Sequence, residues 1–205
     1  MTKRGLFITF EGGEGCGKTT HSKLLADFLR QRGYKVLHTR EPGGTKISEA
    51  IRKVLLSTKN KGMDPLCEML LYMAARVEII KEKILPALKK GHIVICDRFL
   101  DATVAYQGYA GSIDIKLIKD VGKKVTYGIM PDLTFLLDID VKKGLKRSVG
   151  KKDRMEEKSL RYHRSVRRGY LAIAKKDPKR VKIVPALGNI GETQNNIRRI
   201  VLKLL

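Results

Sequence analysis

The sequence predicts an α/β protein in which five parallel strands form one sheet with helices on both faces. Short apolar runs alternate with longer stretches of helical periodicity along the chain. The run at residues 92–98, "HIVICDR", lacks polar alternation, as expected of a strand buried on both faces. A glycine-rich loop joins the first run to the first helix. Regular alternation of this kind is typical of a parallel sheet covered on both sides.

The individual elements follow from the same signals. Gly33 ends the first helix, and Asp64 with Pro65 is a good helix start, with Asp as the N-cap. Pro86 marks either a kink or the start of a last turn in the long third helix. The predicted strands are 5–11, 35–40, 92–98, 132–140 and 180–186. The predicted helices are 17–32, 47–56, 64 to about 90, 114–124, 141–148, 158–175 and 192–204.

Size and composition favour one domain spanning residues 1–205. The chain is 42% apolar, which is enough for a substantial core. The three cysteines are far apart and odd in number, which argues against a disulfide framework or a zinc site. No secretory leader or apolar run of membrane-spanning length is present in the sequence. We therefore expect a soluble, cytoplasmic protein with no membrane partner.

The chain is strongly basic. Lysine and arginine number 43 against 21 acidic residues, for a formal net charge of +22. Such a field attracts anions, including nucleotides and nucleic acids. The basic residues are spread along the chain, however, and form no long basic tail. We therefore do not expect nucleic acid to be the main partner.

The loop after the first strand matches the pattern G-x-x-x-x-G-K-[ST] of a P-loop. Its glycines let backbone N–H groups wrap a phosphate chain, and the following helix adds its positive dipole end. Lys18 is predicted to reach the β and γ phosphates, and the Thr19 hydroxyl to ligate Mg²⁺. The predicted ATP-binding residues of the loop are Gly12, Gly13, Glu14, Gly15, Cys16, Gly17, Lys18 and Thr19.

A carboxylate inside such a loop is unusual, because it would repel a triphosphate. Glu14 is explained if it points away from ATP, toward a hydroxyl or cation of a second substrate; the alternative is a solvated loop residue. The sequence has no N-K-x-D motif, which GTPases use to read guanine. The loop alone leaves ATPases, helicases and small-molecule kinases open.

Charged residues also gather at the predicted carboxyl ends of two other strands. Arg40 ends the second strand, and Asp97 with Arg98 ends the third. In a doubly wound sheet, ligands bind at this edge, beside the P-loop. Guanidinium groups clamp phosphate in a bidentate manner, so two arginines there predict a second phosphate-bearing substrate. Surface ion pairs are the alternative.

Taken together, the motifs resemble the thymidylate kinase family over essentially the whole chain. They are "FEGGEGCGKTT", "REPGGT", "YMAAR", "DRFLDATVAYQG" and "DRME", in this order. The resemblance implies a three-layer P-loop kinase fold with a short lid, transfer of a phosphoryl group from MgATP to dTMP, and a homodimer. It also implies that Glu41 and Pro42 can be joined by a cis peptide bond.

The resemblance further implies roles for the acceptor side. Arg98 would bridge the dTMP phosphate and the transferred group, Arg40 would support that phosphate, and Asp97 would lie near Mg²⁺. Glu14 would face the sugar 3′-hydroxyl. Tyr72 would stack on thymine and Arg76 would hydrogen-bond one of its carbonyls, since residues four apart share a helix face. The residues implied to line base and sugar are Thr103, Tyr106 and Gln107, with Tyr106 crowding the 2′ position.

These assignments have alternatives. Tyr72 can instead be a core residue, and Arg76 and Gln107 can be ordinary surface residues. At the level of function, the alternatives are another P-loop nucleotide or deoxynucleoside kinase, or a basic nucleic-acid-binding P-loop ATPase.

The lid is expected at about 148–156, within "LKRSVGKKDRME". Some family members carry an arginine in the P-loop where this chain has Gly15, so catalytic positive charge is expected from the lid. Arg154 is the predicted catalytic cation, with Lys151 or Lys152 as alternatives, and Arg147 resembles the arginine that stacks on adenine. Asp153 and Glu156 are expected to tie the lid to the P-loop side. No general base is needed, because the acceptor phosphate is already ionised.

Overall fold

The protein folds around one five-stranded sheet. The computed structural model describes residues 4–148, 150, 152–186 and 188–205. All strand pairs are parallel, in the order β2-β3-β1-β4-β5, which confirms the predicted sheet. The strands are β1 (Phe7–Glu11), β2 (Val36–Arg40), β3 (Ile93–Asp97), β4 (Leu133–Asp138) and β5 (Val181–Pro185).

Helical segments occupy most of the remaining chain. Those on the amino-terminal side are α1 (Lys18–Gln31), α2 (Lys46–Leu56), η1 (Thr58–Asn60), α3 (Pro65–Ile79), η2 (Ile80–Ile84) and α4 (Leu85–Lys89). Those that follow β3 are α5 (Leu100–Thr103), η3 (Val104–Ala110), α6 (Ile115–Val125), α7 (Val141–Arg147), α8 (Leu160–Lys176) and α9 (Ile190–Leu202). No helix in the described part of the chain is both long and apolar enough to cross a membrane.

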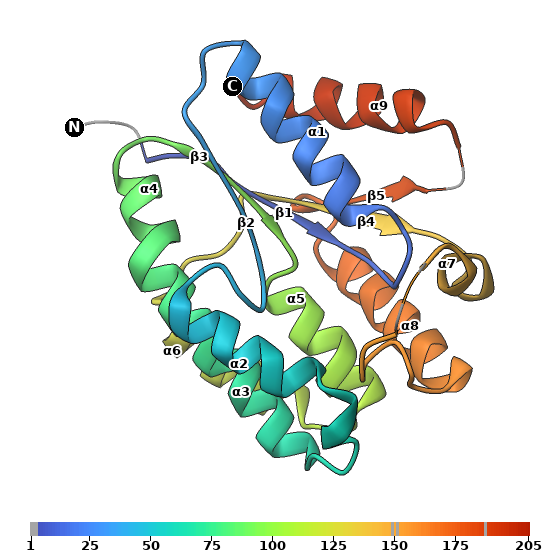
Figure 1. The fold of residues 1–205 in the computed structure, drawn as a ribbon. Helices are drawn as coiled ribbons and strands as arrows, with labels where there is room; N and C mark the ends of the chain where they lie inside the picture. Colours follow the sequence, from blue (N-terminus) through green and yellow to red (C-terminus); the bar gives the residue numbers. More distant parts are fainter. Residues whose placement is uncertain (1–3, 149, 151, 187) are drawn as a thin grey trace.

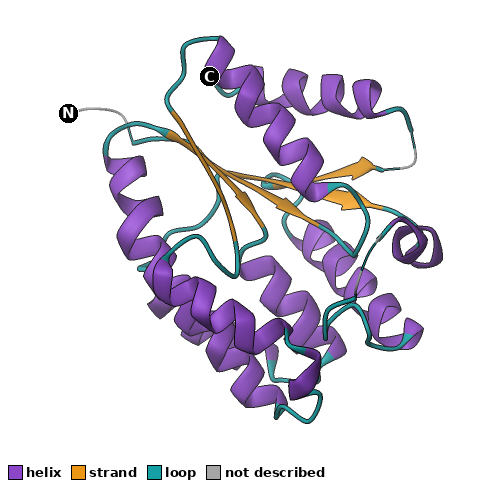
Figure 2. Ribbon diagram, viewed as in Figure 1, coloured by secondary structure: helices purple, strands orange, loops and turns teal. Residues whose placement is uncertain are grey.

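The helices cover both faces of the sheet, so the molecule has three layers (Figures 1 and 2). On one face, α1 and α9 pack over Ile8 and Phe10 of β1. On the other face, Phe7 points into a cluster with α3, η2 and α4, and α8 packs on η3. Successive β1 side chains alternate between these two cores, as the period of a strand requires.

Two helical regions differ from the sequence expectation. The long third helix contains a π-helical turn, η2, just before Pro86, which lies in the first turn of α4. Proline has no N–H to donate, so a shifted hydrogen-bond pattern accommodates it. Residues 100–110, where no helix was expected, form α5 and η3. This segment packs on α8, and those tertiary contacts stabilise a helix that the local sequence does not predict.

Candidate active site

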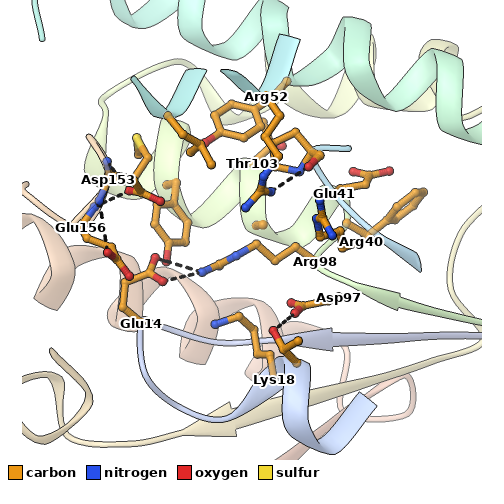
Figure 3. Close-up of a pocket in the computed structure, with 18 of the residues that line it drawn as sticks. Glu14, Lys18, Arg40, Glu41, Arg52, Asp97, Arg98, Thr103, Asp153 and Glu156 are labelled. Atoms are coloured by element: carbon orange, nitrogen blue, oxygen red, sulfur yellow. Dashed lines mark hydrogen bonds and ion pairs between the residues drawn. The ribbon is translucent and has the colours of Figure 1, made fainter. Parts of the chain in front are cut away.

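A cavity of about 490 Å³ opens at the carboxyl edge of the sheet (Figure 3). The P-loop forms one side of it, and the helices on the opposite face of the sheet form the other. The predicted residues that line it are Glu14, Gly15, Gly17, Lys18, Thr19, Arg40, Tyr72, Arg76, Asp97, Arg98, Thr103, Tyr106, Gln107 and Arg147. The structure therefore brings together residues that are far apart in the sequence.

The P-loop is shaped by glycines at positions that exclude side chains. Gly15 has a φ of 63°, and a Cβ there would lie 1.9 Å from the carbonyl oxygen of Gly144 in α7. Gly17 precedes α1 with a φ of 89° and offers no side-chain cap to its first N–H groups. These amides and the helix dipole are thus available to an anion. Lys18 is buried and its Nζ donates to the Gly13 carbonyl at 2.7 Å.

Three residues of the loop do not line the cavity with the others. Gly12 accepts a hydrogen bond from Arg98 through its carbonyl, and Gly13 lines a small adjacent hollow. Cys16 is 2% exposed and its side chain belongs to the core under α1. Gly12 and Gly13 have no side chain and that of Cys16 is buried, so these three residues can meet the predicted ATP only through main-chain atoms.

Thr19 and Asp97 meet at the floor of the cavity. The Thr19 hydroxyl donates to the Asp97 carboxylate at 2.6 Å, which joins the start of α1 to the end of β3. A hydroxyl and a carboxylate are hard oxygen ligands of the kind that Mg²⁺ prefers. The pair therefore fits the metal that the sequence predicts between these two residues.

Arg98 crosses the cavity from the end of β3 to the P-loop (Figure 3). Its backbone φ is 69°, a region that non-glycine residues rarely adopt. Nη1 donates to the Gly12 carbonyl at 3.1 Å and to the Tyr170 hydroxyl at 3.3 Å, while Nη2 donates to both carboxylate oxygens of Glu14 at 2.9 and 3.0 Å. Such strained conformations cluster at functional sites.

Glu14 lies within this network instead of facing solvent. The Tyr106 hydroxyl donates to Glu14, whose side chain is largely buried. Burial disfavours the charged carboxylate, but Arg98 and then Lys18 outweigh it and lower the pKa of Glu14 to about 2. An ionised Glu14 thus holds Arg98 and Tyr106 together at the boundary between the two sides of the cavity.

Two further arginines flank this centre. Arg40 is about half exposed and pairs with Glu49 of α2 at 3.0 Å. Arg52, which the sequence analysis missed, lines the same cavity and donates to the Pro42 carbonyl at 2.8 Å. Arg52 could have been predicted to face inward, because it follows Ser48 by one helical turn and Ser48 is a buried residue of α2. The peptide bond before Pro42 is cis, as the resemblance implied.

Arg76 and Tyr72 both reach the cavity from α3, as their spacing predicted. Arg76 is only 2% exposed, and its Nε donates to the Glu41 carboxylate at 2.7 Å. Its Nη2 donates to the Thr103 hydroxyl at 3.1 Å. Burial raises the pKa of Glu41 to about 7, against the opposing effect of Arg76. Arg76 is thus a fixed cation in the cavity wall.

Arg154 does not lie where the sequence prediction put it. It is 2% exposed, does not line the cavity, and forms an ion pair with Glu68 of α3. Its Nε donates to the Leu55 carbonyl at 2.7 Å. A catalytic role for Arg154 at the transferred phosphoryl group is therefore not supported in this conformation. The prediction failed because Arg154 and Glu68 are both buried, whereas charged side chains usually lie at the surface.

The structure describes most of the remaining residues in and beside the predicted lid, with the exception of residues 149 and 151. Arg147 lines the cavity near the P-loop and donates to the Ala186 carbonyl at 2.9 Å. Lys152 is exposed, and the prediction for Lys151 lies outside the described residues. Glu156 accepts from the Ser148 hydroxyl at 2.6 Å, so it ties the two ends of the lid to each other and not to the P-loop.

A parallel sheet with a P-loop after its first strand, and a second set of cations facing that loop, defines a P-loop kinase of small molecules. A family model described as thymidylate kinase matches residues 10–197. The chain belongs to the thymidylate kinase family.

Individual relatives agree over nearly the full chain. The thymidylate kinase of Geotalea daltonii is 46% identical over 207 residues, covering 97% of each chain. That of Thermoanaerobacter sp. (strain X514) is 43% identical over 204 residues, covering 98% of this chain and all of the relative. The crystal structure of thymidylate kinase from Ehrlichia chaffeensis superposes with a TM-score of 0.80 at 37% identity, covering 97% of this chain and 99% of that one.

Proposed function

We propose that the protein transfers the γ-phosphoryl group of MgATP to dTMP, giving dTDP and ADP for dTTP biosynthesis. The observation that carries this proposal is one cavity with a P-loop on one side and Arg98 spanning to the other. The family membership supports the choice of dTMP as acceptor and ATP as donor.

On the donor side, the main chain of the P-loop binds the phosphates of ATP and Lys18 neutralises the β and γ groups. Arg147 lies beside the loop, where it can stack on adenine. Thr19 and Asp97 would hold Mg²⁺, which neutralises phosphate charge when bound. The hydrogen bond between these two side chains supports this assignment.

On the acceptor side, Arg98 holds the dTMP phosphate with support from Arg40, and we add Arg52 to this set because it shares the cavity wall. Tyr72 stacks on thymine and Arg76 donates to one of its carbonyls. Additional contacts to base and sugar come from Thr103, Tyr106, Gln107 and Glu14.

The chemistry requires alignment and charge neutralisation, and no base. The acceptor oxygen is ionised, so catalysis consists of holding donor and acceptor in line and stabilising charge on the moving group. We propose that residues 148–156 act as a lid that closes over the phosphates and excludes water. In this proposal, a lid lysine supplies cationic charge from above, while Arg154 stays anchored to Glu68.

We further propose a cytoplasmic homodimer. Four apolar side chains of α2 and α3, none of which lines the cavity, are 44–52% exposed, and exposed apolar faces are typical of protein interfaces. They are Ile47, Val54, Leu66 and Leu70. The three free cysteines are consistent with a reducing compartment. Light scattering tests the dimer, and Leu70→Arg is expected to give monomers.

An acceptor panel tests the proposed function. ADP release is measured with MgATP and each of dTMP, dUMP, dCMP, AMP and thymidine. We expect dTMP to have the highest kcat/KM, because the family membership favours dTMP and because Arg76 can donate to the carbonyl at ring position 4, which dCMP and AMP lack. A clear preference for thymidine or AMP would overturn the proposal.

A further inference from the structure

We propose that Glu68, held by Arg154, is a positioning residue that fixes the side-chain amide of Gln107 so that its carbonyl faces the acceptor base. This inference rests on the proposed function and extends it to the choice among pyrimidines. It also gives Arg154 a place in the enzyme that differs from the one expected from the sequence.

Hydrogen-bond and ion-pair contacts connect Gln107 in the cavity wall to Glu68 behind it, and Glu68 to Arg154. Gln107, on η3, lines the cavity and is 2% exposed. Behind it lies Glu68, which is 6% exposed and does not line the cavity. Gln107 Nε2 donates to Glu68 Oε1 at 2.8 Å. Gln107 therefore stands between a buried carboxylate and the space for the base.

The chemistry of the two groups sets the orientation of the amide. An ionised carboxylate can only accept hydrogen bonds, so the NH₂ group of Gln107 must face Glu68. The carbonyl oxygen then points to the opposite side of the amide. Turning the amide over would place its oxygen against the carboxylate and break a charge-assisted hydrogen bond. Gln107 consequently presents an acceptor to the base.

Arg154 holds this carboxylate in place. Its Nη1 pairs with Glu68 Oε2 at 2.5 Å, which balances a charge that burial would otherwise disfavour. Arg154 is itself fixed to the end of α2, through its Nε to the Leu55 carbonyl and its backbone N–H to the Leu56 carbonyl at 3.1 Å. The cavity wall around Gln107 is thereby connected, through Glu68, to Arg154 of the lid segment and to the end of α2.

This orientation selects among pyrimidines. Thymine and uracil carry an N–H at ring position 3, whereas cytosine carries a lone pair there. The Gln107 carbonyl accepts from the former and repels the latter, because two acceptors would then face each other. Arg76 is held separately by Glu41 and Thr103, so it contributes independent discrimination through the carbonyl at position 4.

The test is Glu68→Gln, with kcat/KM measured for dTMP, dUMP and dCMP. A glutamine at position 68 can either donate or accept, so the amide of Gln107 is free to turn. We expect the dTMP-to-dCMP ratio to fall by about ten-fold or more. The dTMP-to-dUMP ratio should stay within about two-fold, since both bases carry the N–H. Glu68→Asp, which keeps an acceptor-only group, should retain more of the dTMP-to-dCMP ratio than Glu68→Gln.

The outcomes separate the possible failures. If the wild type does not prefer dTMP to dCMP, the proposed function fails. If the wild type has the preference and a folded Glu68→Gln variant keeps it, only the positioning role is overturned. Equal losses with all three nucleotides would show that Glu68 is merely structural. Should the unpaired Arg154 prevent folding, the variant Glu68→Gln with Arg154→Met removes both charges, and its ratio decides the question.

Discussion

The donor side of the cavity is formed mainly by main-chain groups of one loop, whereas the acceptor side is formed by side chains from several elements. The donor side is one continuous loop, residues 12–19, whose glycines expose main-chain amides and whose Lys18 supplies charge. The acceptor side is assembled from α3, η3 and the loop after β2, and its polar side chains are fixed by buried ion pairs such as Arg76 with Glu41. The phosphate of a nucleotide can be recognised by main chain alone, whereas a base requires placed side chains.

The largest effect is expected on the donor side. Lys18→Ala removes the only side-chain ammonium among the loop residues, so kcat should fall by about 10²–10³-fold through lost stabilisation of the transferred group. Steady-state kinetics with dTMP and MgATP measure it. Lys23→Ala, an exposed residue of the same helix, is the matched control and should keep wild-type activity. Equal kcat values in the two variants would contradict the donor assignment.

On the acceptor side, removing one partner of a buried ion pair should cost stability as well as activity. Glu41→Ala removes the oxygen that accepts from Arg76 Nε and leaves the buried guanidinium without this partner, at a cost of about 3 kcal/mol in the free energy of unfolding. Urea denaturation measures this. The exposed Arg40–Glu49 pair provides the comparison, because Glu49→Ala should cost about 0–1 kcal/mol. Similar losses in the two variants would show that burial does not set the strength of the acceptor wall.

The junction of the two sides contains a buried carboxyl that should make stability depend on pH. Glu11 accepts from the Phe99 N–H and from the Tyr170 hydroxyl. Burial, and then the Asp101 carboxylate, raise the pKa of Glu11 to about 8. The folded state thus binds a proton that the unfolded state has released, so stability falls as pH rises from about 4.5 to about 8.

Between pH 7 and pH 8, Glu11 is the larger contributor, because Glu41, with a pKa of about 7, has already lost about half of its proton at pH 7 and Glu14, with a pKa of about 2, is ionised throughout. The wild type should lose about 1 kcal/mol of unfolding free energy across this interval. Glu11→Gln, which resembles the protonated carboxyl, should remove most of that decline and leave the smaller part that comes from Glu41. Urea titrations at the two pH values provide the measurement, and an unchanged slope in Glu11→Gln would rule out Glu11 as its source.

The smallest effect is expected from Tyr106→Phe. The change deletes the hydroxyl that donates to Glu14 but keeps the ring, which is proposed to crowd the 2′ position. The KM for dTMP should rise by about two- to five-fold, corresponding to one lost hydrogen bond. The kcat/KM ratio of dUMP to UMP should be preserved. A collapse of that ratio would mean that the hydroxyl, and not the ring, excludes ribonucleotides.

The difference between the donor side and the acceptor side also explains which parts of the structure could be predicted from the sequence. The strand, loop and helix from β1 to α1 were predicted to within two residues, because glycine placement and apolar periodicity are local signals. On the acceptor side, Arg40 and Arg98 could be predicted beside the P-loop from the strand ends alone, whereas the roles of Tyr72 and Arg76 required the family resemblance. Glu41 and Glu68 could not be recognised as buried, because charged residues are usually exposed and their partners lie 35 and 86 positions away.

The central claim is that two anionic substrates occupy one cavity, with ATP held by the P-loop and dTMP held by arginines opposite. Calorimetric titration of dTMP and of a non-hydrolysable ATP analogue into Lys18→Ala and Arg98→Ala tests it most directly. We predict that Lys18→Ala weakens the ATP analogue by about ten-fold or more and leaves dTMP nearly unchanged, whereas Arg98→Ala weakens dTMP by about ten-fold or more. Unaltered dTMP affinity in Arg98→Ala, or dTMP binding lost with Lys18→Ala, would contradict the account.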